Sequence, residues 1–257
     1  MTNPVITIFD IETAPMQAYV WRMWKENVGL KQVVEHGYLM SFAWKELGEK
    51  EVNYAETRTE DDKELTRLLR DVLDRSDVVI AHNADRFDIP VFRTRCIKHG
   101  FAPPSPFKTI DTLKVAKREF RFNSNSLAYL SNFLEVEEKD SHKEFPGFEL
   151  WLECMRGNHL AWKEMKKYNI QDVVTLEKVY EKLKPFDSRH PNLGVYMEPS
   201  VPTCPKCGGQ HVHYRGYAYT GVNKYRKFQC QTCGGWGRSR FTSYPKEKRH
   251  ALYTNAV

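Results

Sequence analysis

The sequence predicts an α/β protein in which helices flank a mixed β-sheet, followed by a small C-terminal β module. Three observations support this fold class. Short apolar strand patterns alternate with longer helical patterns up to about residue 184. Residues 185–203 interrupt this periodicity with four prolines. The remaining residues contain two Cys-x-x-Cys pairs with strand-like sequence between them.

The first elements follow one another in a simple order. Residues 4–9 form an apolar strand, and residues 15–30 form a loop or short helix rich in tryptophan and methionine. Two more strands are expected near 38–44 and 51–55. A helix is expected to begin at Thr59, where Thr-Glu-Asp-Asp resembles a capping box, and to end near Arg75.

Further elements complete the larger region. Residues 77–81 are a short buried strand, and Pro90 falls in the first turn of a helix that ends near His99. A strand at 107–110 follows, and Asp111 is placed to cap the next helix. Helices near 126–135 and 158–184 close a domain of residues 1–184. We expect a proline-rich linker at 185–203, the β module at 204–241 and a flexible basic tail at 242–257.

Charge divides along the same boundary. The 257 residues carry a formal net charge of +6, but residues 204–257 alone contain ten basic residues and one acidic residue. Residues 1–203 therefore have a net charge of −3, and the basic C-terminal region suggests a polyanionic partner. No stretch approaches the roughly 20 apolar residues of a membrane span, and the N-terminus lacks a signal-peptide pattern. We expect an intracellular, cytoplasmic protein with no membrane partner.

Four carboxylates and one tyrosine are the candidate catalytic residues: Asp10, Glu12, Asp88, Tyr168 and Asp172. The first two follow an apolar strand and are two residues apart, so their side chains point to the same side. The last two are four apart in a helical pattern and share a face. A cluster of carboxylates that cannot neutralise itself requires divalent cations, and two bound cations are a common device for phosphodiester hydrolysis.

These residues lie in three segments that resemble, in the same order, the motifs of the DEDD superfamily of 3′–5′ exonucleases. The segments are Phe9-Asp10-Ile11-Glu12-Thr13, Asn83-Ala84-Asp85-Arg86-Phe87-Asp88 and Tyr168-Asn169-Ile170-Gln171-Asp172. The likeness is to the proofreading exonuclease domain of family-B DNA polymerases, and it covers roughly residues 4–184. Relatives that use histidine place it five residues before the last aspartate, at Lys167 here, so Tyr168 fits the tyrosine branch.

The resemblance implies a ribonuclease-H-like fold and a metal-dependent 3′–5′ exonuclease with two Mg²⁺ or Mn²⁺ ions as cofactors. Asp10 would contact both ions, Glu12 and Asp172 would complete one site, and Asp88 would support the other. Tyr168 would orient the attacking water. The resemblance also suggests that the terminal nucleotide contacts three further residues: Thr13, Asn83 and Phe87. A core position for Phe87 and a local backbone contact for Asn83 are equally open.

The two cysteine knuckles are near copies: Cys204 with Cys207, and Cys230 with Cys233, each pair followed by two glycines. Two-residue spacing lets both thiolates of a pair reach one ion, and the glycines permit the tight turn that this requires. The arrangement resembles a zinc ribbon with one structural Zn²⁺. Four sulfur ligands leave no open coordination position, so this site is not catalytic.

The strands between the knuckles interleave aromatic and basic residues, which suits a surface that grips nucleic acid. The candidate contacts are Arg215, Tyr225, Arg226 and Lys227. A zinc ribbon that docks a protein partner is the alternative.

Three functions therefore remain in view. The first is a 3′–5′ exonuclease for which DNA is favoured over RNA as substrate and partner. The second is a 3′–5′ exoribonuclease, and the third is a non-catalytic scaffold that binds nucleic acid or protein. The group Trp21, Met23 and Trp24 is expected to pack as a flap over the sheet, with a base-stacking surface as the alternative.

Overall fold

The computed structural model describes residues 3–136 and 144–256. The chain forms two compact units, Val5–Tyr180 and Glu181–Val257, and the first four residues group with the second unit. Within the described residues, no helix combines the length and the apolar character needed to cross a membrane.

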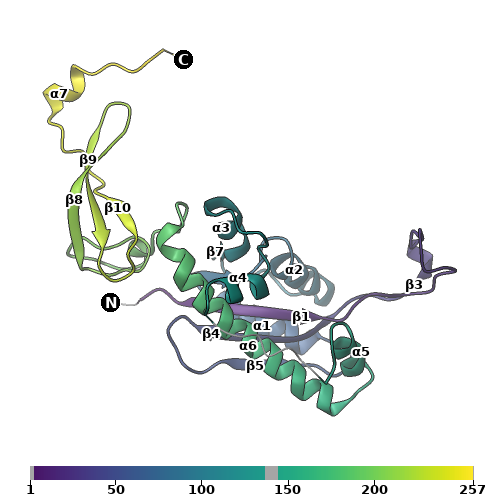
Figure 1. The fold of residues 1–257 in the computed structure, drawn as a ribbon. Coiled ribbons are helices and arrows are strands. Elements are labelled where there is room, and N and C mark those ends of the chain that lie inside the picture. The colour runs from purple at the N-terminus through teal and green to yellow at the C-terminus, as the bar shows by residue number, and fades with distance from the viewer. Residues whose placement is uncertain (1–2, 137–143, 257) are drawn as a thin grey trace. The chain divides into compact units, whose positions relative to one another are not determined.

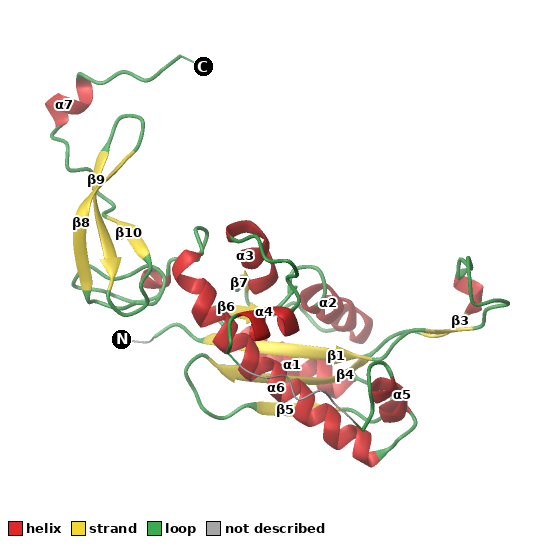
Figure 2. Cartoon of the chain, in the orientation of Figure 1, coloured by secondary structure: helices red, strands yellow, loops and turns green. Residues whose placement is uncertain are grey.

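The first unit is built on a five-stranded mixed sheet with the strand order β5-β4-β1-β6-β7 (Figures 1 and 2). β1 runs antiparallel to β4 and parallel to β6. β4 and β5 are antiparallel, and β6 and β7 are parallel. The strands are β1 (Ile6–Thr13), β4 (Leu39–Glu46), β5 (Asn53–Glu56), β6 (Val78–Ala81) and β7 (Lys108–Asp111). The α/β class and the mixed sheet are confirmed.

Helices cover both faces of this sheet. They are α1 (Lys63–Asp74), α2 (Asp88–His99), α3 (Thr112–Glu119), α4 (Leu127–Phe133), α5 (Glu149–Met155) and α6 (His159–Leu183). Side chains of α1 and α2 pack with Phe9 and Ile11 of β1 on one face. Side chains of α5 and α6 pack with Met40 of β4 in a second core cluster. Since successive strand residues point to opposite faces, Asp10 and Glu12 point away from the face covered by α1 and α2.

Several predicted boundaries shift. β1 continues to Thr13, so Asp10 and Glu12 lie within the strand and not after it. α5 was not predicted. The predicted start of α1 at Thr59 is wrong, because the helix begins at Lys63 with Asp62 as its N-cap residue. The prediction that Asp111 caps α3 is confirmed, because its carboxylate accepts the N–H groups of Leu113 and Lys114.

The side chain of Asp62 makes no capping hydrogen bond to α1, because its carboxylate has other partners. Its two oxygens accept hydrogen bonds from the guanidinium of Arg95, at 2.5 and 2.6 Å, and one also accepts the N–H of Leu39. His99 Nε2 lies 2.6 Å from the same group. Burial alone would raise the pKa of Asp62, but these hydrogen bonds outweigh it and leave the pKa below its usual value. The ion pair between Asp62 and Arg95 joins the start of α1 to α2, and the hydrogen bond from Leu39 joins Asp62 to the start of β4.

A long two-stranded extension leaves the sheet between β1 and β4. It contains β2 (Gln17–Ala18), the short 3₁₀ helix η1 (Leu30–Gln32) and β3 (Val33–Glu35), and we call residues 15–35 the arm. The N–H of Ala14 bonds to the carbonyl of Tyr38, and the N–H of Tyr19 bonds to the carbonyl of Gln32. The arm is therefore an antiparallel ribbon continuous with the central strands, and it projects away from the sheet (Figure 1).

The second unit contains a three-stranded antiparallel sheet with the order β10-β9-β8. Its elements are η2 (Lys184–Phe186), η3 (Leu193–Val195), β8 (Val212–Tyr219), β9 (Lys224–Cys230), β10 (Trp236–Arg238) and α7 (Lys246–His250). The residues before β8 contact the cysteine knuckles, since Leu193 N–H bonds to the carbonyl of Pro205 and Lys206 Nζ to that of Pro185. A small antiparallel sheet beside four cysteines fits a zinc-ribbon module, as expected.

Replacing Asp62 with Asn should destabilise the first unit by about 3–5 kcal/mol, because Arg95 would be left buried without a counter-charge. Urea unfolding followed by far-UV circular dichroism measures the loss. The wild-type advantage should be complete above about pH 4 and should disappear as the pH falls through the lowered pKa of Asp62.

Asp71→Asn is the matched control. Asp71 forms ion pairs with Arg67 and Arg70 but is 42% exposed, so its loss should cost less than about 1 kcal/mol. Equal losses in the two variants would contradict a special role for the buried pair.

Candidate active site and metal centres

Three of the predicted carboxylates converge. Oxygen atoms of Asp10, Glu12 and Asp172 all lie within 4.8 Å of one another. Asp10 and Glu12 are half-buried on β1, and Asp172 is buried on α6. Strand alternation and helical periodicity bring about this meeting, because the polar residues of β1 face α6 while Phe9 and Ile11 enter the opposite core.

Asn169 links the two elements that carry these carboxylates. Its Nδ2 donates hydrogen bonds to Asp10 Oδ2 at 2.8 Å and to the carbonyl oxygen of Asp10 at 3.2 Å. Its Oδ1 accepts a hydrogen bond from the Ser41 hydroxyl of β4 at 3.2 Å. Asn169 is fully buried, so it fixes α6 over β1 and orients one carboxylate. The sequence motifs predicted no role for Asn169, although it lies inside the third motif.

Trp151 of α5 is a second residue that the sequence analysis missed. Its Nε1 donates a hydrogen bond to Glu12 Oε2 at 3.0 Å. Its ring meets that of Tyr168 edge to face, with the ring centroids 5.9 Å apart. The Glu12 contact spans 139 positions of the chain, so no local sequence pattern could have revealed it.

Tyr168 lies among the carboxylates. Its hydroxyl donates a hydrogen bond to Asp172. Burial raises the pKa of Tyr168 far above its ordinary value, and the negative charges of Asp172, Glu12 and Asp10 raise it further. The phenol is therefore protonated at neutral pH and acts as a hydrogen-bond donor.

Asp88 approaches the site from the start of α2, outside the group of three. On β1, only Ile6–Ile8 pair with β6. Ile11 lies farther along the same strand, and its N–H donates a hydrogen bond to the carboxylate of Asp88. The side chain is 1% exposed. Burial raises the pKa of Asp88 to about 7, and the charge of Asp111 adds to the effect. Its Oδ2 is buried and has no hydrogen-bond partner among the residues that the structure describes.

The loop between β6 and α2 is held by Asp111. This carboxylate accepts the N–H of Asn83 at 3.0 Å and that of Asp85 at 3.3 Å, in addition to capping α3. Asn83 adopts φ +69°, a left-handed conformation that asparagine tolerates better than most residues. One carboxylate thus organises both the loop that leads to Asp88 and the following helix.

The predicted substrate contacts lie near these residues along the chain. Thr13 is half-buried at the end of β1, where the pairing with β4 shifts register. Phe87 directly precedes Asp88 and is 41% exposed, so it is not a core residue. Asn83 is half-buried, and its backbone is tied to Asp111. A cavity of about 510 Å³ lies beside Thr13, between the root of the arm and α2, and His36, Tyr38, Pro90 and Lys98 help to line it.

The donor set fits divalent cations. Asp10, Glu12 and Asp172 offer only carboxylate oxygens, which Mg²⁺ and Mn²⁺ prefer over imidazole. The partnerless, buried Oδ2 of Asp88 supports the same fit, because such an atom is costly unless a cation or a proton satisfies it. The residues of this centre could therefore hold metal.

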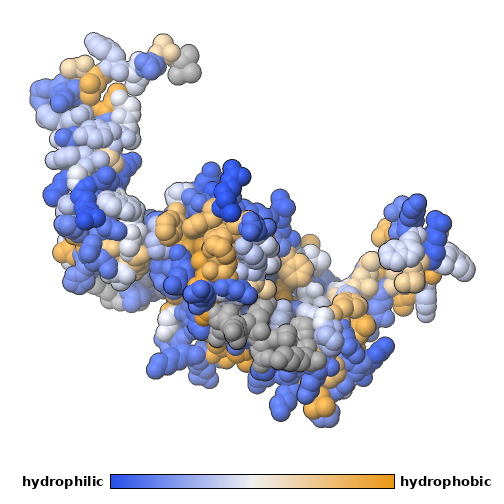
Figure 3. Space-filling model, viewed as in Figure 1, coloured by the Kyte–Doolittle hydropathy of each residue, from blue (hydrophilic) through white to orange (hydrophobic). Residues whose placement is uncertain are grey.

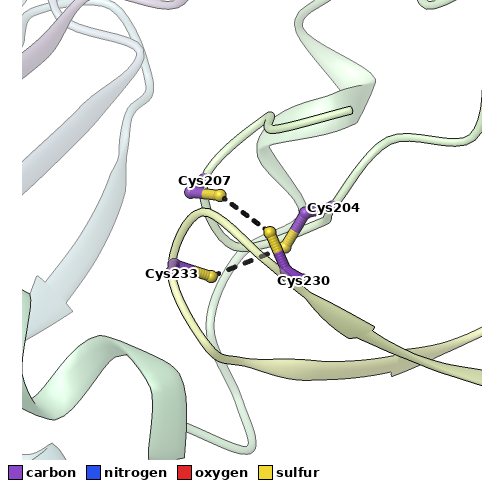
Figure 4. Close-up of side chains that lie close together, drawn as sticks. All are labelled: Cys204, Cys207, Cys230 and Cys233. Atoms are coloured by element: carbon purple, nitrogen blue, oxygen red, sulfur yellow. Dashed lines mark hydrogen bonds between the residues drawn. The ribbon is translucent and has the colours of Figure 1, made fainter. Parts of the chain in front are cut away.

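The second candidate metal centre comprises Cys204, Cys207, Cys230 and Cys233, whose sulfur atoms cluster at the ends of the two knuckles (Figure 4). Sulfur atoms from opposite knuckles face one another, with Cys204 Sγ 3.8 Å from Cys233 Sγ and Cys207 Sγ 3.6 Å from Cys230 Sγ. Four sulfurs within 4.8 Å suit tetrahedral zinc.

The knuckle backbones have the turn that the glycines predicted. Gly208 and Gly234 both have φ near +75°, a conformation that glycine adopts without penalty. The N–H of Gly209 points at Cys207 Sγ, 3.4 Å away. The hydrogen bond between Cys204 and Cys207 lowers the pKa of Cys204 to about 5 and raises that of Cys207, so the pair readily holds one thiolate. Cys96 and Cys154 lie outside this cluster, and burial raises their pKa values to about 11 and 12, so they remain thiols.

The strands of the ribbon present aromatic rings covered by cations. Arg226 lies 3.8 Å from the ring centre of Tyr214, Lys224 lies 3.7 Å from that of Tyr217, and Arg238 lies 3.9 Å from that of Tyr225. Lys227 similarly approaches Trp236 at 5.3 Å, and Arg215 donates a hydrogen bond to Gln229. The four cation–ring contacts each fix a positive group beside a ring.

A bulge in β8 places the rings of Tyr214, Tyr217 and Tyr219 on one face of the ribbon. The pairing with β9 shifts between Tyr214 and Tyr217, and Gly216 in the bulge has φ +72°. Tyr214, Tyr217 and Tyr219 are opposite Phe228, Arg226 and Lys224, which alternate along β9 and so share one face.

Comparison with known proteins places the larger unit. Residues 25–184 match the family described as the RNase_H superfamily. The chain belongs to the RNase H superfamily. The matched region includes Asp88, Tyr168 and Asp172 but begins after Asp10 and Glu12. A search of curated proteins found no match.

One similar solved structure is a family B DNA polymerase from the hyperthermophilic archaeon Pyrobaculum calidifontis. The TM-score is 0.54 at 16% sequence identity, and the alignment covers 72% of this chain. It spans only 25% of the polymerase chain. At this identity the likeness establishes a shared fold, and the ribonuclease-H-like architecture of the first unit is confirmed.

The raised pKa of Asp88 gives a pH test in Zn²⁺-loaded protein without Mg²⁺ or Mn²⁺. Between about pH 4 and pH 7 the folded state binds one more proton at Asp88 than the unfolded state, so this group makes the protein less stable as pH rises. Asp88→Asn lacks this dependence. Its stability relative to wild type should therefore increase from pH 4 to pH 7, by up to about 4 kcal/mol, and then level off.

Urea unfolding at a series of pH values measures this difference. Asp85→Asn is the control, because Asp85 lies in the same loop but pairs with Lys114 at the surface. A difference between Asp88→Asn and wild type that stays constant with pH would contradict the assignment.

Proposed function

We propose that this chain is a metal-dependent 3′–5′ exonuclease that hydrolyses phosphodiester bonds, with DNA as the favoured substrate. The observation that carries the proposal is the convergence of Asp10, Glu12 and Asp172 within 4.8 Å, with Tyr168 bonded to Asp172. Membership of the RNase H superfamily supports nuclease chemistry. The 3′–5′ polarity and the preference for DNA come from the resemblance of the three motifs to the tyrosine-branch DEDD exonucleases.

The carboxylates would hold two divalent cations, Mg²⁺ or Mn²⁺. By the resemblance, Asp10 would serve both ions, Glu12 and Asp172 would serve one, and Asp88 would support the other. When bound, such cations stabilise the attacking and leaving oxygens of a displacement at phosphorus. The protein residues around them keep the carboxylates in place: Asn169 orients Asp10, and Trp151 orients Glu12.

Tyr168 has a positioning role in this proposal. Burial and the neighbouring carboxylates raise the pKa of Tyr168 in the metal-free site, which favours a hydrogen-bond donor over a base. Its hydroxyl instead orients a water molecule beside Asp172, and the edge-to-face contact with Trp151 holds the ring in place. Thr13, Asn83 and Phe87 would contact the terminal nucleotide.

The zinc ribbon would grip nucleic acid outside the catalytic centre. The net charge of +9 on residues 204–257 supports this role, as do the exposed Arg215 and Arg226 and the adjacent Tyr225 and Lys227. We also propose residues 1–184 as the catalytic domain, 185–203 as the connection and 204–241 as the ribbon.

The direct test uses 3′-labelled and 5′-labelled DNA and RNA strands with Zn²⁺-loaded protein, to which Mg²⁺ or Mn²⁺ is added. Metal-stimulated release of single nucleotides from the 3′ end of DNA is the expected result. Preferential digestion of RNA would make the protein an exoribonuclease. Binding of either strand without metal-stimulated cleavage would make it a scaffold.

Two sets of variants test the centre itself. Asp10→Ala and Asp172→Asn should each reduce cleavage at least about 10³-fold, because metal binding supplies several kcal/mol of transition-state stabilisation. Tyr168→Phe should slow cleavage by about 10²-fold or less, since the ring remains and only one hydrogen bond is lost. Thermal melts should be close to wild type. Undiminished cleavage by Asp10→Ala would refute the site.

Replacing Cys204 and Cys207 with Ser should release zinc and unfold the ribbon, because a module of this size buries little core without metal. Affinity for a 30-nucleotide strand should fall at least about tenfold. Cleavage of a short oligonucleotide should persist at a reduced rate. Bound zinc, strand affinity and cleavage are measured on the same preparation, and unchanged strand affinity after zinc loss would favour a protein-docking ribbon.

A further inference from the structure

The arm exposes large aromatic side chains that the catalytic proposal does not use. Trp21 is 95% exposed, Trp24 79% and Tyr19 78%, and Met23 and Leu30 are also exposed. The expectation that Trp21, Met23 and Trp24 pack as a flap over the sheet is therefore wrong. Figure 3 shows apolar and hydrophilic side chains next to one another on this projection, apart from the rest of the first unit.

The aromatic rings of the arm are open on both faces. Among the described residues, Tyr19, Trp21 and Trp24 make no ring–ring and no ring–cation contact. The rings of the ribbon differ, because Tyr214, Tyr217 and Tyr225 each have a cation over one face. Open rings are suited to stacking against flat groups.

Charge identifies the kind of flat group. Residues 19–31 contain three basic residues (Arg22, Lys25 and Lys31) and one acidic residue, Glu26, whereas residues 1–203 as a whole are net negative. Arg22 pairs with Glu26, but Lys25 and Lys31 are exposed and form no ion pair within residues 3–136 and 144–256. Rings interleaved with cations match bases interleaved with phosphates.

The position of the arm links it to the carboxylates. Only Thr13 and Ala14 separate Glu12 from its first residue, and the same pair of strands continues into it. Nine residues from Glu12 to Trp21 span at most about 30 Å. A strand of several nucleotides whose end occupies the carboxylate centre is thus long enough to reach the arm.

We infer that the arm binds unpaired nucleic acid by stacking bases on Tyr19, Trp21 and Trp24, with Lys25 and Lys31 contacting phosphates. A duplex hides its base faces in its own stack, so single strands are the ligand that open rings select. The inference rests on the proposed function in one respect, namely that the bound strand runs toward Asp10 and Glu12. The binding itself is measured without catalysis.

The test is the affinity of the full-length, zinc-loaded protein for fluorescein-labelled (dT)₂₀, measured by anisotropy in buffer with Ca²⁺ but no Mg²⁺ or Mn²⁺. The double variant Trp21→Ala/Trp24→Ala should bind at least about tenfold more weakly. Trp21→Leu/Trp24→Leu should lose as much, because it keeps apolar surface but no ring. Trp21→Phe/Trp24→Phe should stay within about threefold of wild type, because it keeps both rings.

Ile97→Ala is the matched control, because Ile97 is an equally exposed apolar residue on α2 (80% exposed). It should leave the affinity unchanged. In wild type, (dT)₂₀ should quench tryptophan emission, and the phenylalanine double variant should lose most of this quenching. Circular dichroism and thermal melts check that each variant is folded, as expected for exposed positions.

Three results would overturn the inference. The first is unchanged affinity in the alanine double variant, and the second is full affinity in the leucine double variant. The third is a sedimentation mass of the alanine double variant that differs from wild type while its (dT)₂₀ affinity is unchanged, which would assign the arm to protein association. Failure of the arm and failure of the nuclease proposal are separable. If the wild type cleaves DNA but the alanine double variant binds normally, only the inference about the arm is refuted. If binding depends on the arm but no cleavage occurs, only the nuclease proposal is refuted.

Discussion

Mutual repulsion of carboxylates is the constraint on which the first unit depends. Two ionised groups less than 4.8 Å apart repel by about 3 kcal/mol or more at the effective dielectric of a protein surface. Three such groups on β1 and α6 stay together because the surrounding core fixes both elements and because Asn169 and Trp151 donate hydrogen bonds to them. The fold therefore concentrates negative charge at one point, which suits the binding of cations.

β1 is the element that makes this arrangement possible. It pairs on one side with β4 along nearly its whole length and on the other side with β6 along its first half only. The open half of that edge receives Asp88 from α2, through the N–H of Ile11. Beyond the sheet, the same strand continues toward the arm. One strand thus connects the core, the carboxylates and an exposed aromatic surface.

Local periodicity was sufficient to predict the geometry of the carboxylates. Spacings of two on a strand and four on a helix correctly placed Asp10 with Glu12 and Tyr168 with Asp172 on common faces. The cap formed by Asp111 was also visible in the sequence, because capping involves near neighbours. Likewise, paired cysteines with following glycines predicted the knuckle turns of the ribbon.

The features that the sequence did not predict depend on residues far away in the chain, or on whether a surface is present for apolar side chains to pack against. Asp62 has the sequence context of a helix cap, but Arg95, 33 positions away, takes its carboxylate. Trp151 reaches Glu12 across 139 positions from a helix that has no clear sequence signal. The arm was misjudged because its composition is apolar, and composition does not reveal whether a surface exists for those side chains to pack against.

The bulge in β8 shows that the register of strand pairing can matter as much as residue identity. Arg215 and Gly216 together occupy the space opposite one residue of β9, so Tyr214 and Tyr217 share a face although they are three positions apart. If β8 and β9 instead paired residue for residue, without the bulge, the ribbon would keep every tyrosine and every cation. Tyr217 and Tyr219 would nevertheless turn to the reverse side of the ribbon, away from Arg226 and Lys224, and the row of rings would be divided between two surfaces.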